Sequence, residues 1–371
     1  MTATNVYASN KRPLQESTTN PMKLLIISDA WHPQINGVVR TYEHISQEMQ
    51  KLGHTVKVIG PADFPMSVPM PGYKEIRLAI APYRKLQRII KKYNPDHIHL
   101  PTEGPLGWAG RKYCLRNERR FSTAFHTRFP EYVAQRAAQI LPSSHDFVHA
   151  RVVNYVRRFH APSSGMTVAT GSLEETLKNW GFQNPMHRVT RSACLDTFTP
   201  GEKTLFHDLK GPIALYVGRI AIEKNIEDFL KMDWPGSKVI VGTGPQKAEL
   251  EQKYPDALFV GKKTGAELVE HYRSADLFVF PSRTDTFGIV LIEALACGLP
   301  VAAYNVTGPK DIITKDFLGS LHDTNLSLAA KTALQNKDLE KRTTHVHKEY
   351  TWQHAAAQYE DMILNKILQT R

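Results

Sequence analysis

Cysteine is scarce in this chain: three of the 371 residues are cysteines, and Cys114, Cys194 and Cys297 lie far apart. Their number and spacing argue against a disulfide framework or a zinc knuckle. The sequence also lacks an apolar run of the roughly 20 residues that span a bilayer, and residues 1–21 lack the apolar core of a signal peptide. We therefore expect a cytoplasmic protein with reduced cysteines, of which Cys114 and Cys297 pack in helices.

A dinucleotide fingerprint is also missing, because no Gly-x-Gly-x-x-Gly follows any apolar run of strand length. Its absence ranks a nicotinamide-dependent dehydrogenase low. The composition is that of a globular protein, with 42% apolar and 22% charged residues. A chain of this length predicts two domains at roughly 100–200 residues per domain.

Short apolar runs alternate with helical patterns along both halves of the chain. In the first half the expected strands are residues 23–28, 55–59, 96–100, 121–125 and 166–169. In the second half they are residues 213–217, 238–241, 257–260, 277–280 and 300–303. Such runs are typical of buried parallel strands, so the sequence predicts an α/β protein with two Rossmann-like doubly wound domains and a cleft between them.

The expected boundaries follow from the breaks between these patterns. Residues 1–21 read as a flexible tail, and residues 22–197 form the first domain. The second domain spans residues 198–351, and Pro200 and Gly201 mark the break at its start. Residues 352–371 form a C-terminal helix that we expect to pack back toward the first domain.

Positive charge is concentrated in the first half. Residues 1–200 hold 26 Lys and Arg against 14 Asp and Glu, whereas residues 201–371 hold 21 against 22. On the expected helix 83–93, apolar residues recur at helical spacing and five cations fill the other face: Arg84, Lys85, Arg88, Lys91 and Lys92. This pattern suits a peripheral anionic membrane surface, and a solvated outer face is the alternative. No recognition motif accompanies the charge, so nucleic acid is a weaker candidate partner.

Ligands of open parallel sheets bind outside the carboxyl ends of the strands, which directs attention to the loops there. Gly37 precedes a helix and permits backbone approach to a phosphate, although a glycine in a loop is more often a turn. Arg219 and Lys224 follow another strand and could clamp a diphosphate, unless Lys224 pairs with a local acid such as Glu223 or Glu227. Gly242 lies in a third such loop, Gly242-Thr243-Gly244-Pro245.

The most informative stretch runs from Pro281 to Pro300. It follows an expected strand and contains an acidic loop, an expected helix and a glycine that ends the helix. If the helix begins near Phe287 and Gly288, its free amides can meet a phosphate while Asp285 stands beside the pocket. Glu293 lies two turns further along, among apolar side chains, where a carboxylate needs a partner. Helix capping by Asp285 and solvation of Glu293 are the alternatives.

At this segment the sequence resembles the retaining glycosyltransferases of the GT-B type whose signature is Glu-x7-Glu, here Asp285-x7-Glu293 (the glycosyltransferase family 4 type). The resemblance covers about residues 22–365. It includes the Pro33 to Gly37 loop, His126-Thr127, Gly218-Arg219, Glu223-Lys224-Asn225 and Ser282 to Pro300. Residues 28–38 and 126–132 resemble the branch that holds sulfolipid synthases and lipid mannosyl- or glucosyltransferases.

The resemblance implies specific roles in binding a nucleotide-diphosphate sugar. Gly37 would approach the diphosphate, Arg219 and Lys224 would neutralise it, His126 would contact the transferred sugar, Asp285 would bind its hydroxyls, and Glu293 would bind the ribose. The backbone amides of Phe287, Gly288 and Ile289 would face phosphate and sugar. No Asp-x-Asp pair occurs in the chain, so we expect no metal and no cofactor, with cations and helix amides stabilising the leaving group.

Two positions depart from the family pattern. Asp285 is one methylene shorter than the usual Glu, and Arg191-Ser192-Ala193-Cys194 stands where an Asn/Arg-Gly-Val-Asp run is common.

We expect transfer of a hexosyl unit from a UDP- or GDP-sugar to a membrane lipid such as diacylglycerol or a glycolipid, at the inner face of the cytoplasmic membrane. A soluble sugar or polysaccharide acceptor is the first alternative, and a nucleotide-sugar-binding protein without transfer activity is the second.

Overall fold

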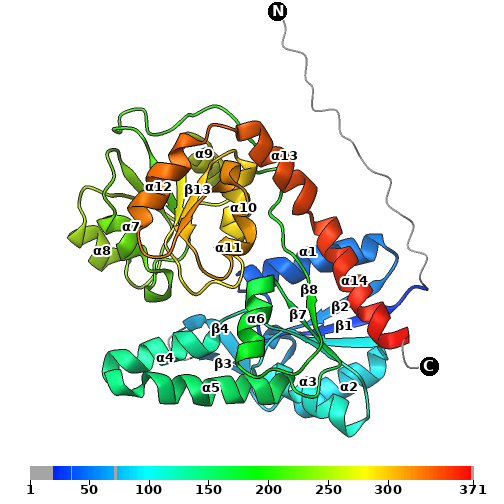
Figure 1. The fold of residues 1–371 in the computed structure, drawn as a ribbon. Coiled ribbons are helices and arrows are strands. Elements are labelled where there is room, and N and C mark those ends of the chain that lie inside the picture. The colour runs from blue at the N-terminus through cyan, green and yellow to red at the C-terminus, as the bar shows by residue number, and fades with distance from the viewer. Residues whose placement is uncertain (1–19, 35, 71–72, 369–371) are drawn as a thin grey trace, which may run out of the picture.

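A computed structural model describes residues 20–34, 36–70 and 73–368 of the chain (Figure 1). Of the tail predicted over residues 1–21, only Asn20 and Pro21 are described, and Ile35 of the loop before Gly37 also lies outside the described residues. Two α/β domains make up the described chain, each built on a parallel sheet.

The first sheet has the strand order β2-β1-β5-β6-β7-β8. Its strands are β1 (Lys23–Ile27), β2 (Thr55–Ile59), β5 (His97–Leu100), β6 (Ser122–Ala124), β7 (Gly165–Val168) and β8 (Met186–Arg188). Neighbouring strands pair in parallel, with Leu24 opposite both Val56 and His97. The strands β1, β5, β6 and β7 are covered by helices on both faces, which explains why they read as apolar runs.

Besides the C-terminal helix described below, six helices surround this sheet within the described residues: α1 (Gly37–Lys51), α2 (Tyr83–Tyr93), α3 (Pro105–Arg116), α4 (Phe129–Ile140), α5 (His145–His160) and α6 (Gly171–Asn179). A small antiparallel hairpin, β3 (Ser67–Met70) and β4 (Tyr73–Ala79), precedes α2. Figure 1 shows α2, α3 and α5 on the side of this domain that faces away from the second domain.

The second sheet has the order β11-β10-β9-β12-β13-β14. Its strands are β9 (Ala214–Val217), β10 (Lys238–Val241), β11 (Leu258–Gly261), β12 (Leu277–Phe280), β13 (Val301–Tyr304) and β14 (Gly319–His322). Its helices are α7 (Ile226–Lys231), α8 (Lys247–Lys253), α9 (Gly265–Ser274), α10 (Ile289–Ala296), α11 (Pro309–Ile312), α12 (Leu326–Gln335) and α13 (Leu339–Glu349). The order changes direction at β9, where loops after β9 and β12 diverge to opposite faces and create room for a ligand.

The chain crosses between the domains twice. After the second domain, α14 (Trp352–Leu368) returns to the first domain and packs on α1, as Figure 1 shows in red. Buried residues of the two partners form one apolar cluster, which includes Ile45 and Met49 of α1 with Tyr359 and Ile363 of α14. The C-terminal helix thereby fastens the second domain to the core of the first.

Every strand expected from the apolar runs is present, within one or two residues at each end. The elements that the sequence reading missed are short or polar: β8 has three residues, β14 reads Gly-Ser-Leu-His, and β3 carries a proline. Cys114 is buried in α3, whereas Cys297 is buried directly after α10 instead of within it, and Cys194 is exposed; all three are free. None of the described helices is both long and apolar enough to cross a bilayer.

The α14 contact gives the first prediction. We expect Ile363→Ala to lower the free energy of unfolding by about 2–5 kcal/mol, because the side chain is fully buried and its removal leaves a cavity. Urea denaturation followed by circular dichroism measures the change. Leu328→Ala is the control, since Leu328 is 48% exposed and should change stability by less than about 0.5 kcal/mol. Equal effects of the two substitutions would show that α14 contributes little to the fold.

Candidate active site

The acidic loop after β12 is held at the edge of the second sheet by hydrogen bonds to the turn after β9. The hydroxyls of Ser282 and Thr284 donate to the carbonyl of Glu223, at 3.4 and 3.3 Å. The Asn225 amide donates to the carbonyl of Pro281 at 3.2 Å. These bonds bring the segment from Glu223 to Asn225 against the loop that carries Asp285.

Lys224 and Asp285 meet as an ion pair at this point, with Nζ and Oδ1 2.6 Å apart. The pairing of Lys224 with a local acid, which the sequence left open, is therefore wrong. Burial lowers the pKa of Lys224, but the Asp285 carboxylate, Tyr132 and Tyr216 together outweigh burial and raise it, so the lysine is a cation at neutral pH. The other oxygen of Asp285, Oδ2, is buried and has no hydrogen-bond partner in the described chain.

Tyr132 of α4 in the first domain faces the same loop. Burial, and after it the negative charge of Asp285, raise the pKa of the Tyr132 phenol to about 12. The hydroxyl is therefore protonated at neutral pH and can donate a hydrogen bond. An aromatic donor from the first domain thus lies beside the ion pair of the second.

Glu293 is 3% exposed and lies on α10. It has the partners that its apolar surroundings require. The Tyr272 hydroxyl donates to Oε2 at 2.8 Å, and the Arg40 guanidinium of α1 lies 3.6 Å from Oε1. Burial raises the pKa of Glu293, and these two partners oppose the shift. The solvated position that was the alternative for Glu293 is wrong.

The glycine-rich loops of the second domain pack backbone to backbone. A Cβ at Gly242 would lie 1.8 Å from the carbonyl oxygen of Gly218, and one at Gly244 would lie 2.1 Å from that of Ile220. This contact fixes the loop that carries Arg219, whose side chain is half-buried. Packing alone therefore accounts for glycine at position 242.

Two helix N-termini meet this region from opposite domains. In the first domain, Asn36 caps α1 by accepting from Val38 N and Val39 N, and a Cβ on Gly37 would meet nothing within 4 Å. In the second domain, α10 starts at Ile289, one residue later than expected, after Gly288 with a φ of 96°. Phe287 is buried directly before it.

His126 follows β6 and uses both ring nitrogens within the first domain. Its Nε2 lies 2.9 Å from the Tyr42 hydroxyl, and its Nδ1 accepts from the Arg191 guanidinium at 2.6 Å. Burial, and next the Arg191 charge, hold the pKa of His126 well below its usual range, so the ring is neutral. Its carbonyl oxygen accepts a hydrogen bond from the Thr286 hydroxyl at 2.7 Å.

The Thr286 bond is one of several that join the two domains. Thr170 donates to the carbonyl of Thr286 at 3.3 Å, and Asp311 accepts hydrogen bonds from the backbone amide and the hydroxyl of Ser172 at the start of α6. The Arg40–Glu293 pair is a further link. Asp285, Phe287 and Glu293 of the second domain therefore lie at the domain interface, together with His126.

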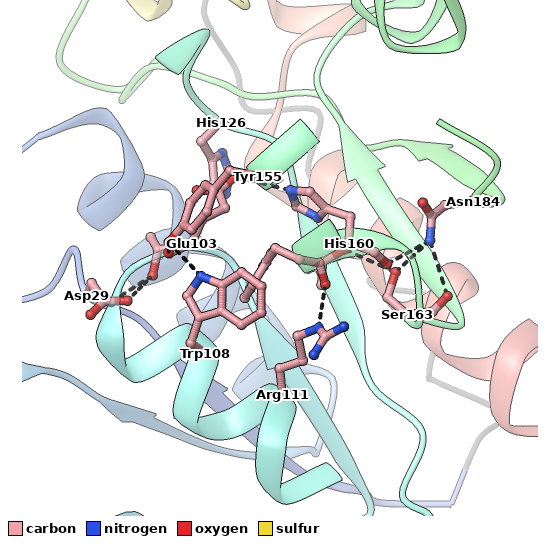
Figure 2. Close-up of polar contacts among 12 residues, drawn as sticks. Asp29, Glu103, Trp108, Arg111, His126, Tyr155, His160, Ser163 and Asn184 are labelled. Carbon is pink, nitrogen blue, oxygen red and sulfur yellow. Dashed lines mark hydrogen bonds and ion pairs between the residues drawn. The ribbon is translucent and has the colours of Figure 1, made fainter. Parts of the chain in front are cut away.

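A second polar network supports the first domain beside this interface, as Figure 2 shows. The Asp29 carboxylate accepts from Leu106 N and Gly107 N at the start of α3. Glu103 lies 3.1 Å from His160 Nε2, and its carbonyl accepts from the Tyr155 hydroxyl. Burial raises the pKa of Asp29 to about 6. The network fixes α3 and α5 to the ends of β1 and β5.

The linker that departs from the family pattern keeps an ordered turn. The backbone at Ser192 does not adopt a positive φ, so glycine is not required there. The Ser192 hydroxyl donates to the carbonyl of Tyr350, which lies on the second crossing between the domains. Cys194 accepts at its carbonyl from Thr197 N and Phe198 N. The linker therefore forms this turn with serine and cysteine at the positions where Gly and Asp are common in the family pattern.

The five basic residues of α2 are all exposed, and the apolar Leu86 and Ile90 face the domain core. The helix therefore presents only its cationic face to the outside. The cations are Arg84, Lys85, Arg88, Lys91 and Lys92, none of which lies at the domain interface described above.

Comparison with known proteins identifies the family. Residues 35–191 match the family model described as Glycosyltransferase Family 4, and residues 202–350 match the model described as Glycosyl transferases group 1. The fold is that of the GT-B glycosyltransferases. The chain belongs to glycosyltransferase family 4 and is a hexosyltransferase.

Among its relatives is a GDP-mannose-dependent alpha-mannosyltransferase from Mycobacterium tuberculosis, 28% identical over 81% of this chain and 83% of the relative. Another is an alpha-monoglucosyldiacylglycerol synthase from Streptococcus pneumoniae, 24% identical over 81% and 75%. Among solved structures, sucrose-phosphate synthase from Thermosynechococcus elongatus gives a TM-score of 0.73 at 20% identity, covering 94% of this chain and 100% of the other. Anabaena Alr3699/HepE in complex with UDP gives 0.66 at 14% identity, covering 93% and 100%.

The sequence reading missed four residues that complete this site: Arg40, Tyr132, Arg191 and Tyr272. Arg40 stands one helical turn after Gly37, so its position on α1 could have suggested it. Tyr272 gives no local signal, because it approaches Glu293 from a different helix. Tyr132 and Arg191 were quoted only as parts of motifs, and their roles depend on how the domains meet.

The burial of Glu293 gives the second prediction. Because its pKa is raised above 4.5 in the folded chain, the folded state binds this proton more tightly than the unfolded state does. Its contribution to the free energy of unfolding is therefore lost as the pH rises from about 4.5 through the folded-state pKa. We expect Glu293→Gln to become progressively more stable relative to the wild type over that range.

Urea denaturation at pH 4.5, 6.0 and 7.5 measures the difference between the two proteins. Asp29 titrates in both, so its contribution cancels in the subtraction. Glu340→Gln, at an exposed glutamate of α13, is the matched control and should show a constant difference. A difference for Glu293→Gln that does not change with pH would contradict the prediction.

Proposed function

We propose that the protein transfers a hexosyl unit, with retention, from a nucleotide-diphosphate sugar to a hydroxyl of a membrane lipid. The main evidence that the site binds a sugar donor is the buried Oδ2 of Asp285. This oxygen has no hydrogen-bond partner in the described chain, whereas Oδ1 pairs with Lys224. A buried carboxylate oxygen without a hydrogen bond is costly, and a sugar hydroxyl would satisfy it. A structural neighbour binds UDP and a relative depends on GDP-mannose, which supports a UDP- or GDP-sugar donor.

The donor roles follow from where the residues lie. Arg219 and Lys224 stabilise the diphosphate, and the N-terminal amides of α1 at Gly37 and of α10 at Ile289 add partial positive charge. Glu293, on α10 within reach of the Tyr272 hydroxyl, binds the ribose hydroxyls. These cations and amides stabilise the negative charge of the leaving diphosphate, which a metal ion would otherwise do, so we propose that transfer needs no metal cofactor.

The proposed chemical step is a front-face displacement. The bond between the anomeric carbon and the diphosphate oxygen breaks, and the acceptor oxygen bonds to that carbon on the same face of the sugar. The acceptor proton moves to the departing diphosphate, so the step needs no protein base. This assignment agrees with the neutral His126, whose ring nitrogens are both engaged and which cannot accept a proton without losing the Arg191 bond.

The acceptor part rests on a continuous basic face of the first domain. Tyr83 of α2 lies under the cations of Lys112 and Arg116 of α3, at 5.0 and 5.6 Å from the ring centre. Next along the face, Arg111 of α3 donates to the carbonyls of Arg158 and Phe159 of α5. The three basic helices α2, α3 and α5 therefore lie side by side (Figure 1).

Exposed apolar side chains accompany these cations. Phe147 and Tyr155 of α5 are 68% and 48% exposed, and Leu141 before α5 is 57% exposed. The Arg151 guanidinium of α5 lies over the Phe147 ring, 5.7 Å from its centre, and a cation beside an exposed aromatic group suits an anionic bilayer surface. A relative is named alpha-monoglucosyldiacylglycerol synthase, which supports a lipid acceptor. We place this acceptor at the inner face of the cytoplasmic membrane.

The donor proposal gives the third prediction. We expect one nucleotide sugar from a panel of UDP- and GDP-sugars to release its nucleotide in the presence of anionic vesicles that contain diacylglycerol. Lys224→Met should lower kcat/KM for that donor by about 100-fold or more, because a preorganised cation beside the leaving group is lost. Nucleotide release, measured with a coupled assay, reports turnover.

Lys231→Met is the matched control, since Lys231 is an exposed lysine of α7 that pairs with Glu227 at the surface. It should retain wild-type turnover. Turnover that is the same with and without vesicles would indicate a soluble acceptor instead of a lipid. Nucleotide binding with no turnover of any donor would indicate a binding protein.

The membrane proposal gives the fourth prediction. A variant with all five cations of α2 changed to Gln should bind anionic vesicles at least about tenfold more weakly in low salt, since each cation near the surface contributes about 1 kcal/mol. Vesicle sedimentation measures the binding.

The control variant also has five cations changed to Gln, all of them lysines at exposed positions of the second domain: Lys262, Lys331, Lys337, Lys341 and Lys348. Its net charge equals that of the α2 variant, so it separates a local surface from overall charge. Equal losses in the two variants would show that α2 is not the membrane-facing helix.

A further inference from the structure

Arg191 is a buried cation without an acidic partner. It follows β8 at the start of the linker and is 8% exposed. Within the described residues no carboxylate forms an ion pair with it, and its Nη1 has no hydrogen-bond partner. Burial lowers the pKa of Arg191 to about 10, so the side chain remains charged at neutral pH.

Three elements that carry proposed donor contacts meet at this guanidinium. Its Nη2 donates to His126 Nδ1 at 2.6 Å, and its Nε donates to the Thr41 hydroxyl at 3.2 Å. Thr41 in turn donates to the carbonyl of Gly37, at 2.6 Å. The guanidinium carbon also lies 6.0 Å from the centre of the Phe287 ring, across the domain interface.

The contact with His126 determines which ring nitrogen carries the proton. A guanidinium has five N–H donors and no acceptor, so His126 Nδ1 must present its lone pair. Because the ring is neutral, its single proton is on Nε2. That N–H donates to the Tyr42 hydroxyl, which lies 2.9 Å away.

The direction of the following hydrogen bonds then has one solution. Tyr42 accepts from His126 and therefore donates to His99 Nε2 at 2.7 Å. The proton of His99 is on Nδ1, which donates to the Ser122 hydroxyl at 2.7 Å. Ser122 donates to His97 Nε2, also at 2.7 Å. One arginine thus orients a row of neutral side chains that begins at the domain interface and ends inside the first sheet.

A purely structural role accounts poorly for this residue. Removing a cation from water without a counter-charge is destabilising, and an apolar side chain of similar size would fill the same space at lower cost. Arg342, the other described arginine with comparable burial, is different because it donates to the carbonyls of Gly298 and Phe317 and so satisfies the backbone.

We infer that Arg191 is a positioning residue of the transfer reaction, which acts by fixing the tautomer and orientation of His126 against the donor loop. It holds His126 with the Nε2 proton turned toward Tyr42 and anchors the first turn of α1 through Thr41. The Phe287 ring of the second domain lies over the Arg191 guanidinium, so the surroundings of Arg191 depend on the position of the loop that carries Asp285. This inference rests on the proposed role of His126 beside the transferred sugar.

Nitrogen-15 NMR of the full-length protein labelled at histidine tests the assignment directly. In the wild type, His126 should show an unprotonated Nδ1 and a protonated Nε2, with its signals identified by their loss in His126→Gln. Arg191→Gln offers an amide that can accept as well as donate, so we expect His126 to populate both tautomers. Tyr42→Phe should leave Nδ1 unprotonated, because Arg191 still faces it.

Kinetics with the donor that turns over provide the second readout. Arg191→Gln should lower kcat about tenfold or more and change the donor KM by a smaller factor, because the guanidinium acts through its hydrogen bonds to His126 and Thr41. Arg191→Lys keeps the charge and a donor to Nδ1, and should recover part of kcat together with the wild-type tautomer. Arg342→Gln is the control: it should lower stability and leave both the His126 signals and kcat/KM near wild type.

Either measurement can overturn the inference. A wild-type His126 that is protonated at Nδ1 would contradict it without any variant, and so would an Arg191→Gln protein that keeps the wild-type tautomer. A kcat that falls no further in Arg191→Gln than in Arg342→Gln would show that the role is structural. The NMR measurement needs no substrate, so failure of the lipid proposal and failure of this inference remain distinguishable.

Discussion

Removal of charged groups from water at the domain interface is the constraint on which the arrangement of this protein depends. A buried charge is tolerated only when a partner or a set of hydrogen bonds replaces the lost hydration. Lys224 and Asp285 replace it for each other within the second domain, and Glu293 needs Arg40 of the first domain in addition to Tyr272. The ionic groups therefore require the two domains to meet in one particular way.

This requirement explains why neither domain contains a complete site. The donor loop lies on the second domain, yet its Thr286 hydroxyl donates to the carbonyl of His126 and its Phe287 ring covers Arg191. Movement of one domain would leave buried polar groups of the other domain without their partners. Polar contacts therefore join the domains at the candidate site, in addition to the apolar contact between α1 and α14.

The fold could be predicted largely from the sequence, because buried parallel strands are continuous apolar runs and glycines mark the turns between them. The elements that were missed, such as β8 and β14, are short or polar and are defined by pairing with a neighbour. The site was predictable where residues follow strands in the chain, as for Asp285 and Lys224. Their pairing was not, because it joins loops 61 residues apart, and Arg191 had no signal of its own.

The two halves of the chain differ in net charge. Residues 1–200 hold an excess of 12 positive charges, whereas residues 201–371 are close to neutral, with 21 basic and 22 acidic residues. An anionic surface therefore attracts one domain and is nearly indifferent to the other. Because the basic helices face away from the second domain (Figure 1), attachment through them would leave the second domain uncovered by the surface. This orientation agrees with the proposed function, in which the basic helices of the first domain contact the membrane while the proposed donor site remains accessible.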